Sequence, residues 1–150
     1  MKSVKAGLND WVNETSPGEY RGTALAGVLF DKDGTLIDFQ RTWGPAIHVV
    51  IHALAQGDAE KVRAQAECLH FDVEASRFAA TSPIIGGATA QYGAAWAQAL
   101  GRDDFAKLRI EIDELAAAAC LTTLTPVGDP SAVLALLRDM GLLHALVSVR

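Results

Sequence analysis

Two aspartates separated by a single residue, Asp31 and Asp33, are the side chains in this sequence best suited to chemistry. Gly34 follows them, and glycine adopts the backbone conformations that a sharp turn requires. If the chain turns there, the two carboxylates converge on one small site. Paired carboxylates bind a hard divalent cation such as Mg²⁺. They also suit a reaction in which one carboxylate is the nucleophile and the other is the general acid and base.

The residues just before the aspartates indicate how this pair is positioned. Leu25 to Phe30 form an apolar run that stops abruptly at charge and glycine. Such a run is typical of a strand buried on both faces in a parallel sheet. Open α/β sheets bind their ligands at the carboxyl ends of the strands. We therefore expect Asp31 and Asp33 to lie at a ligand-binding edge of a sheet.

The same residues have two other interpretations. Asp-x-Asp-Gly begins the calcium loop of the EF-hand, and it is also an ordinary turn composition. Counted from Asp31, the sixth residue is Leu36, where an EF-hand needs glycine, and the twelfth is Thr42, where it needs glutamate. The motif also follows a strand-like run instead of a helix. An EF-hand is thereby excluded, and a plain acidic turn remains the alternative.

The rest of the chain predicts a helical insert between two α/β segments. Residues 1–22 form an N-terminal extension, residues 23–41 hold the first strand and the acidic loop, and residues 42–124 have helical spacing. Residues 125–150 add a helix that begins at Asp129-Pro130 and a second apolar strand, Leu142 to Val149. Within the insert, we expect helices over Trp43 to Ala55, Asp58 to Phe71, Ala88 to Leu100 and onward from Asp103-Asp104.

The order Asp31-Lys32-Asp33-Gly34-Thr35-Leu36 resembles the first motif of the haloacid dehalogenase-like (HAD) phosphohydrolases. The resemblance implies that Asp31 attacks a phosphoryl group and that Asp33 protonates the leaving group and later activates water. It also implies that Mg²⁺ is held by the Asp31 carboxylate and the Asp33 backbone carbonyl, and that Gly34 helps to bind phosphate. A second aspartate at this spacing is similar to the phosphatase branch and unlike the dehalogenases.

The helical insert resembles the cap that one HAD class carries between its first and second motifs. The fold implied is α/β, with a HAD-like Rossmannoid parallel-sheet core and an inserted all-helical cap that selects the substrate. Ser148, at the end of the second predicted strand, occupies the place of the serine or threonine that bonds the phosphoryl group. The implied substrate is a small phosphorylated metabolite, similar to phosphoglycolate.

The resemblance extends over residues 24–148 and omits two later family motifs. These are a lysine or arginine that steadies the phosphate charge and an acidic residue that completes the magnesium site. We therefore expect a truncated HAD protein with an incomplete core. One alternative to a phosphatase is an inactive fragment that is at most a binding or assembly module and self-associates through exposed sheet edges. Another is a non-catalytic helical protein with a fortuitous acidic turn.

Composition excludes several classes of partner. The net charge is −5 and no basic cluster is present, which argues against nucleic acid. No apolar stretch reaches transmembrane length, so we expect no membrane association. Residues 1–22 lack the apolar core of a signal peptide, which favours a cytoplasmic location. Cys68 and Cys120 have no Cys-x-x-Cys spacing, and we expect both to be buried, reduced thiols.

Four residues near the start of the insert have two interpretations each. His48 and His52 are four apart, the helical spacing that can share a metal, but they lack a third ligand nearby. Arg41 suits either a substrate anion or a solvated position beside a hinge. Trp43 is more typical of a core residue than of a ligand contact.

Overall fold

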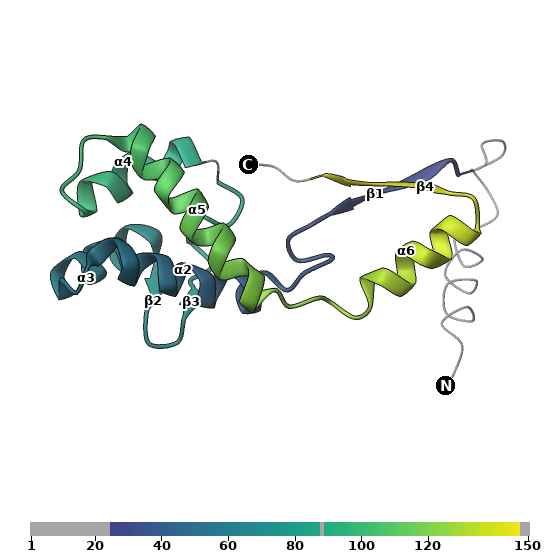
Figure 1. Ribbon diagram of the computed structural model, residues 1–150, viewed down its shortest axis with the longest axis horizontal. Helices are drawn as coiled ribbons and strands as arrows, with labels where there is room; N and C mark the ends of the chain where they lie inside the picture. Colours follow the sequence, from purple (N-terminus) through teal and green to yellow (C-terminus); the bar gives the residue numbers. More distant parts are fainter. Residues whose placement is uncertain (1–24, 88, 148–150) are drawn as a thin grey trace.

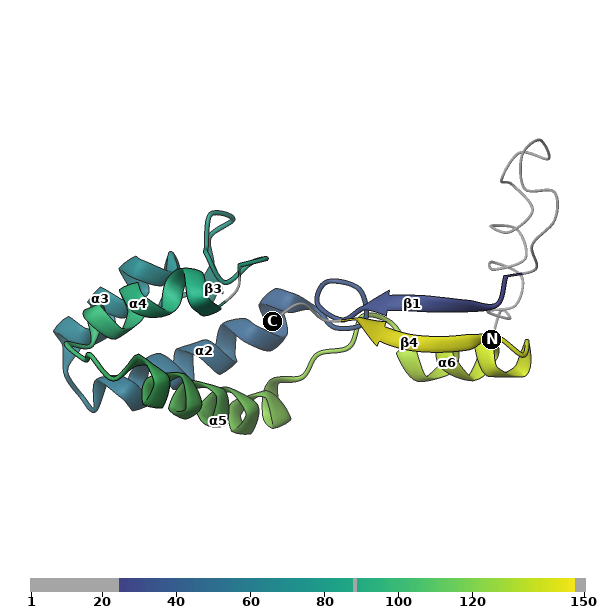
Figure 2. The ribbon, with the colours of Figure 1, turned by 90° about the horizontal axis from the view of Figure 1, so that it is seen from above.

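The chain folds into two lobes at opposite ends of an elongated molecule (Figures 1 and 2). The structure is a computed structural model that describes residues 25–87 and 89–147. The sheet lobe contains β1 (Gly27–Asp31), β4 (Leu143–Val147) and α6 (Pro130–Asp139). The helical lobe contains α2 (Phe39–Ala55), α3 (Ala59–Leu69), α4 (Thr89–Ala99), α5 (Phe105–Thr123) and a hairpin of β2 (Phe71–Asp72) and β3 (Arg77–Phe78). The protein is therefore a mixed α/β protein, as predicted.

Strands β1 and β4 form a parallel pair. Gly27 lies opposite Leu143 and Asp31 lies opposite Val147, so the two strands end together. Both strands run toward the helical lobe (Figure 1). The connection from β1 to β4 passes through the whole helical lobe and then through α6, which packs against β4. The two predicted strands are thus confirmed, and the carboxyl end of the sheet faces the helices.

The predicted burial of these strands is wrong for the described residues. Leu29 in β1 is 72% exposed and Leu143 in β4 is 77% exposed. Every residue of β4 is exposed. A two-stranded sheet beside one short helix cannot bury two faces, which parallel sheets ordinarily achieve with helices on both sides. The apolar residues predict the strands, but burial also depends on what packs against a strand.

The hydrophobic core lies in the helical lobe. Trp96 of α4 is fully buried, and its indole N–H donates to Gln65 Oε1 at 2.8 Å. Gln65 in turn donates to the Ile51 carbonyl at 3.1 Å, so α2, α3 and α4 are joined by buried hydrogen bonds. The apolar side chains around them come from all four helices and the hairpin (Ile47, Val50, Ile51, Leu54, Leu69, Phe71, Phe78, Trp96, Ala97, Leu100, Leu108 and Ile112).

Helix boundaries differ from the predictions where local hydrogen bonds decide them. Helix α2 begins at Phe39 because the Asp38 carboxylate caps it, accepting from the Arg41 amide at 3.0 Å. The predicted start at Trp43 was four residues late. The predicted start of α6 at Asp129-Pro130 is confirmed, with the Asp129 carboxylate accepting from the Ala132 amide.

The expectation of an entirely helical insert is wrong. Phe71 lies opposite Phe78 and Asp72 opposite Arg77 in the antiparallel hairpin of β2 and β3. Each strand has only two residues, too few for the alternation by which strands are recognised in a sequence. No helix in the described part of the chain is both long and apolar enough to cross a membrane.

Gly44 marks a close approach between α2 and the hairpin loop. A Cβ at this position would lie 2.1 Å from the Ser76 carbonyl oxygen, whereas one at Gly93 would meet the Phe105 ring at 2.1 Å. A side-chain ring can turn aside more easily than a backbone carbonyl. We expect Gly44→Ala to lower the free energy of unfolding by about 1–3 kcal/mol, as overpacking does, and Gly93→Ala to lower it less. Denaturant unfolding measures both, and a Gly44→Ala chain as stable as the original would contradict the close approach.

Candidate active site

Asp31 is the last residue of β1, and a sharply folded loop connects it to α2. The Lys32 carbonyl accepts from the amides of Leu36 and Ile37 at 3.0 and 3.1 Å. The Gly34 amide donates to the Ile37 carbonyl at 2.8 Å. Gly34 has a φ of +81°, a conformation that residues with a Cβ rarely adopt. The predicted turn after Asp33 is therefore confirmed, and glycine is required to make it.

The acidic loop lies where the two lobes meet, beside the chain that returns from α5 (Figure 2). The Asp38 amide donates to the Thr125 carbonyl at 2.8 Å, and the Val127 amide donates to the Leu36 carbonyl at 3.0 Å. The Thr125 amide also donates to the hydroxyl of Thr42, which is fully buried. These hydrogen bonds join the segment that leads from β1 into α2 to the segment that follows α5. They thereby hold the acidic loop against the start of α2.

The Asp31 carboxylate is exposed at the carboxyl end of β1. Its Oδ1 accepts from the Lys32 backbone amide at 2.8 Å. A backbone donor fixes the orientation of the carboxylate while its exposure leaves it accessible from solvent. Both properties suit a nucleophile that must meet a substrate arriving from solvent.

The Asp33 carboxylate is partly buried and has a different partner on each oxygen. The indole N–H of Trp43 donates to Oδ1 at 2.7 Å. The Lys32 ammonium lies 3.1 Å from Oδ2 and 4.9 Å from the centre of the Trp43 ring. Asp33 is thus anchored to α2 through an indole, and a cation lies beside both groups.

Cys120 on α5 is a further neighbour of the acidic loop. Burial raises the pKa of its thiol. The nearby Lys32 charge has a smaller effect that lowers this pKa, and the Asp33 charge has a smaller effect that raises it. Cys68 lies in the helical lobe, and burial raises the pKa of that thiol to about 11. Both cysteines are free and partly buried, in keeping with the prediction of reduced thiols.

The structure brings three of the four predicted site residues together. Asp31, Asp33 and Gly34 share one loop at the end of β1. The Gly34 amide is bonded within that loop, so the role visible for Gly34 is to form the turn. Ser148, the predicted phosphate contact on the second strand, lies outside the described residues.

A magnesium ion at this site would use few protein ligands. Among residues 25–87 and 89–147, no three His, Cys, Asp or Glu side chains gather closely enough to hold a metal ion. Mg²⁺ is commonly bound by one or two carboxylates together with water and substrate phosphate. The exposed Asp31 carboxylate and the Asp33 backbone carbonyl are hard oxygen donors of that kind, so the residues present fit the cation.

The two histidines on α2 have structural contacts. The Nδ1 atom of His48 lies 3.0 Å from the Val73 carbonyl and 3.1 Å from the Ser76 hydroxyl. The His48 and His52 rings are 4.5 Å apart, centre to centre. His48 therefore connects α2 to the hairpin loop.

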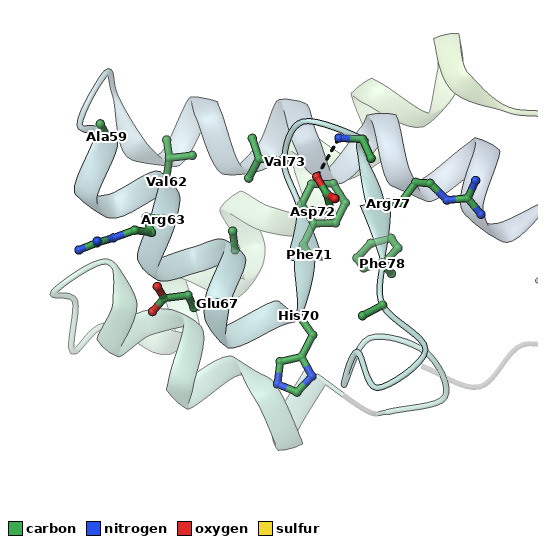
Figure 3. A pocket seen from close by; sticks show the side chains of 13 residues that line it. Ala59, Val62, Arg63, Glu67, His70, Phe71, Asp72, Val73, Arg77 and Phe78 are labelled. Carbon is green, nitrogen blue, oxygen red and sulfur yellow. Dashed lines mark hydrogen bonds between the residues drawn. The ribbon is translucent and has the colours of Figure 1, made fainter.

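A separate open hollow of about 820 Å³ lies on the helical lobe, between α3 and the hairpin (Figure 3). Arg63 and Glu67 of α3 border it, and Asp72 of β2 accepts a hydrogen bond there from the Ala75 amide at 2.8 Å. Its lining includes no residue of the acidic loop. The hollow is therefore distinct from the site of Asp31 and Asp33.

Comparisons of the chain with protein-family models, with curated proteins and with solved structures found no match. The functional assignment accordingly depends on the acidic loop and its surroundings.

Trp43 and Lys32 are the site residues that the sequence reasoning did not assign. Trp43, predicted to be more typical of a core residue than of a ligand contact, packs against the core of the helical lobe, and its indole N–H also reaches Asp33. A usable signal was present, because Asp38 is a favourable N-cap and places Trp43 in the second turn of the helix that follows the acidic loop. Arg41, considered for a substrate anion, is exposed in the first turn of the same helix.

Proposed function

We propose that this chain is a HAD-like phosphohydrolase that cleaves a phosphomonoester with the help of Mg²⁺. The observation that supports the proposal best is an acidic pair on a tight, glycine-dependent loop at the carboxyl end of a parallel strand. In this proposal the sheet lobe is part of a Rossmannoid core. The helical lobe, inserted between β1 and β4, is its cap.

The proposed reaction proceeds in two steps. An oxygen of the Asp31 carboxylate forms a bond to phosphorus while the bond between phosphorus and the leaving oxygen breaks. That oxygen keeps the electron pair and takes a proton from Asp33. Water then attacks the aspartyl-phosphate and gives a proton back to Asp33, which releases phosphate and restores the Asp31 carboxylate.

Mg²⁺ in this proposal would be held by the Asp31 carboxylate and the Asp33 backbone carbonyl. When bound, the cation would neutralise negative charge on the phosphoryl oxygens. The Lys32 amide orients the Asp31 carboxylate by donating a hydrogen bond to it. The Trp43 indole holds the Asp33 carboxylate beside α2 in the same way. Ser148 remains the proposed phosphate contact, whereas Gly34, whose amide donates to the Ile37 carbonyl, shapes the loop.

The proposed substrate is a small phosphorylated metabolite, similar to phosphoglycolate, in a cytoplasmic protein. The acidic loop lies between the lobes, so a substrate at Asp31 would also be close to the start of the helical lobe. Substrate choice would then depend on residues of that lobe, and closure of the lobe would exclude water.

Hydrolysis of p-nitrophenyl phosphate tests the proposal. The 150-residue chain is assayed with Mg²⁺, with a chelator in place of Mg²⁺, and as Asp31→Asn with Mg²⁺. We expect turnover in the first reaction and loss of turnover in the other two. Turnover that persists in the chelated reaction or in Asp31→Asn would contradict the proposal, as would equal background rates in all three.

Exposed apolar strands favour a second candidate function, an assembly module that pairs with a copy of itself. Among residues 25–87 and 89–147, β1 and β4 form a two-stranded sheet in which each strand has one partner and one open edge. Leu29, Leu143 and Leu146 are exposed on these strands. Unpaired edges with apolar side chains promote pairing between chains.

Sedimentation measures this self-association. We expect the chain to form dimers or larger species as its concentration rises. We expect Leu29→Lys or Leu143→Lys to shift the chain toward the monomer, because a lysine buried between two chains opposes their pairing. Leu121→Lys is the matched control, since Leu121 is 86% exposed on α5 of the helical lobe. A chain that stays monomeric at every concentration would exclude the assembly function.

A further inference from the structure

We propose that Trp43 is a positioning residue that anchors the Asp33 carboxylate to α2 through one oxygen and leaves the other oxygen for contact with the leaving group. This inference rests on the proposed phosphatase function and assigns a role within that site. Its basis is the 2.7 Å hydrogen bond from the Trp43 indole N–H to Asp33 Oδ1, together with the Lys32 ammonium 3.1 Å from Oδ2.

The chemistry of the indole makes the two Asp33 oxygens unequal. An indole N–H is only a donor, so the Trp43 contact uses Oδ1 of Asp33 as a hydrogen-bond acceptor. Trp43 itself packs against the core of the helical lobe, which fixes the position of the carboxylate that it holds. Oδ2 is therefore the oxygen left to meet the leaving group and, later, water.

Lys32 is the exchangeable partner in this arrangement. Its ammonium lies 3.1 Å from Oδ2, the oxygen that Trp43 does not contact. The ion pair is partly exposed, with 23% of the Lys32 side chain and 31% of the Asp33 side chain accessible to solvent. A substrate phosphate offers the ammonium another anion, and transfer of Lys32 to that phosphate leaves Oδ2 accessible to the leaving group. Trp43 holds Asp33 in place meanwhile.

Leaving groups of different basicity test this role. An alkyl phosphate such as phosphoglycolate releases an alkoxide that needs a proton, whereas p-nitrophenyl phosphate releases a stable phenolate. We expect Trp43→Phe, which keeps a ring but removes the donor, to lower kcat/KM for phosphoglycolate about 10-fold more than for p-nitrophenyl phosphate, a part of the roughly 10²–10⁴ supplied by general acid–base catalysis. A merely structural role would lower both alike.

Trp96→Phe is the matched control. It removes another indole hydrogen bond, the buried one to Gln65, inside the helical lobe. We expect this change to leave the ratio of the two kcat/KM values unaltered. An equal change of the ratio in Trp96→Phe and Trp43→Phe would overturn the inference.

An NMR measurement of the tryptophan indole groups tests the contact without activity. With ¹⁵N-labelled tryptophan, Asp33→Asn is expected to shift the Trp43 indole resonance and to leave that of Trp96 in place. No shift would overturn the inference. Turnover with an unchanged leaving-group ratio would overturn it while preserving the proposed function, whereas no turnover of either phosphate would overturn both.

Discussion

Asp31→Asn is expected to lower kcat for phosphomonoester hydrolysis by a factor on the order of 10³ or more, the scale that follows loss of a covalent nucleophile. The amide has almost the same shape as the carboxylate, and its side-chain oxygen can still accept from the Lys32 amide. The variant should therefore fold normally. It lacks the negative oxygen that attacks phosphorus and a ligand that suits Mg²⁺. Steady-state kinetics with saturating Mg²⁺ measures the loss.

Asp58→Asn provides the matched control for this variant. Asp58 caps α3 by accepting from the amides of Glu60 and Lys61, far from the acidic loop in sequence. Asparagine is an equally favourable N-cap. We expect Asp58→Asn to retain the original kcat. If the two variants lost activity equally, or if neither lost activity, Asp31 would not be the nucleophile.

Asp33→Asn is expected to have the second largest effect, and the effect should depend on the substrate. Loss of general acid–base catalysis lowers the rate by about 10²–10⁴. Asparagine can still accept from the Trp43 indole, so the loop should keep its position on α2. We expect the greater loss with alkyl phosphates, whose leaving oxygen needs the proton. With p-nitrophenyl phosphate, the first step should survive better than the second.

Rapid-mixing kinetics separates these two steps. Because Asp33 also activates the water that cleaves the aspartyl-phosphate, Asp33→Asn should release a burst of p-nitrophenolate followed by slow turnover. The burst amplitude reports the fraction of chains that become phosphorylated. Equal losses with alkyl and aryl phosphates, without a burst, would contradict the assigned role of Asp33.

The sequence predicted most reliably those features that local residue order determines. The apolar run before Asp31 predicted a strand, and the structure places β1 at Gly27–Asp31. Asp129 and Pro130 predicted the start of α6 for the same local reason. Gly34 predicted the turn, because its positive φ is a property of one residue. These predictions required no knowledge of what packs against each element.

Features that depend on distant parts of the chain were not predictable in the same way. Burial of β1 depends on its neighbours, and Leu29 is exposed despite its apolar character. The hairpin depends on Phe71 meeting Phe78 across a short turn. The role of Trp43 depends on α2 starting at Phe39, which directs the indole back to Asp33. Each of these is a tertiary contact that periodicity does not encode.

The central claim is that Asp31 becomes covalently phosphorylated, and mass spectrometry of the acid-quenched reaction tests it most directly. The 150-residue chain is mixed with Mg²⁺ and p-nitrophenyl phosphate, quenched, digested and compared with Asp31→Asn. The account predicts one added phosphoryl group on the peptide that contains Asp31, removable by hydroxylamine and missing from the variant. The same reaction is run with Asp33→Asn, in which the adduct should accumulate. Turnover without an adduct in the original chain and in Asp33→Asn, or an adduct on another residue, would contradict the account.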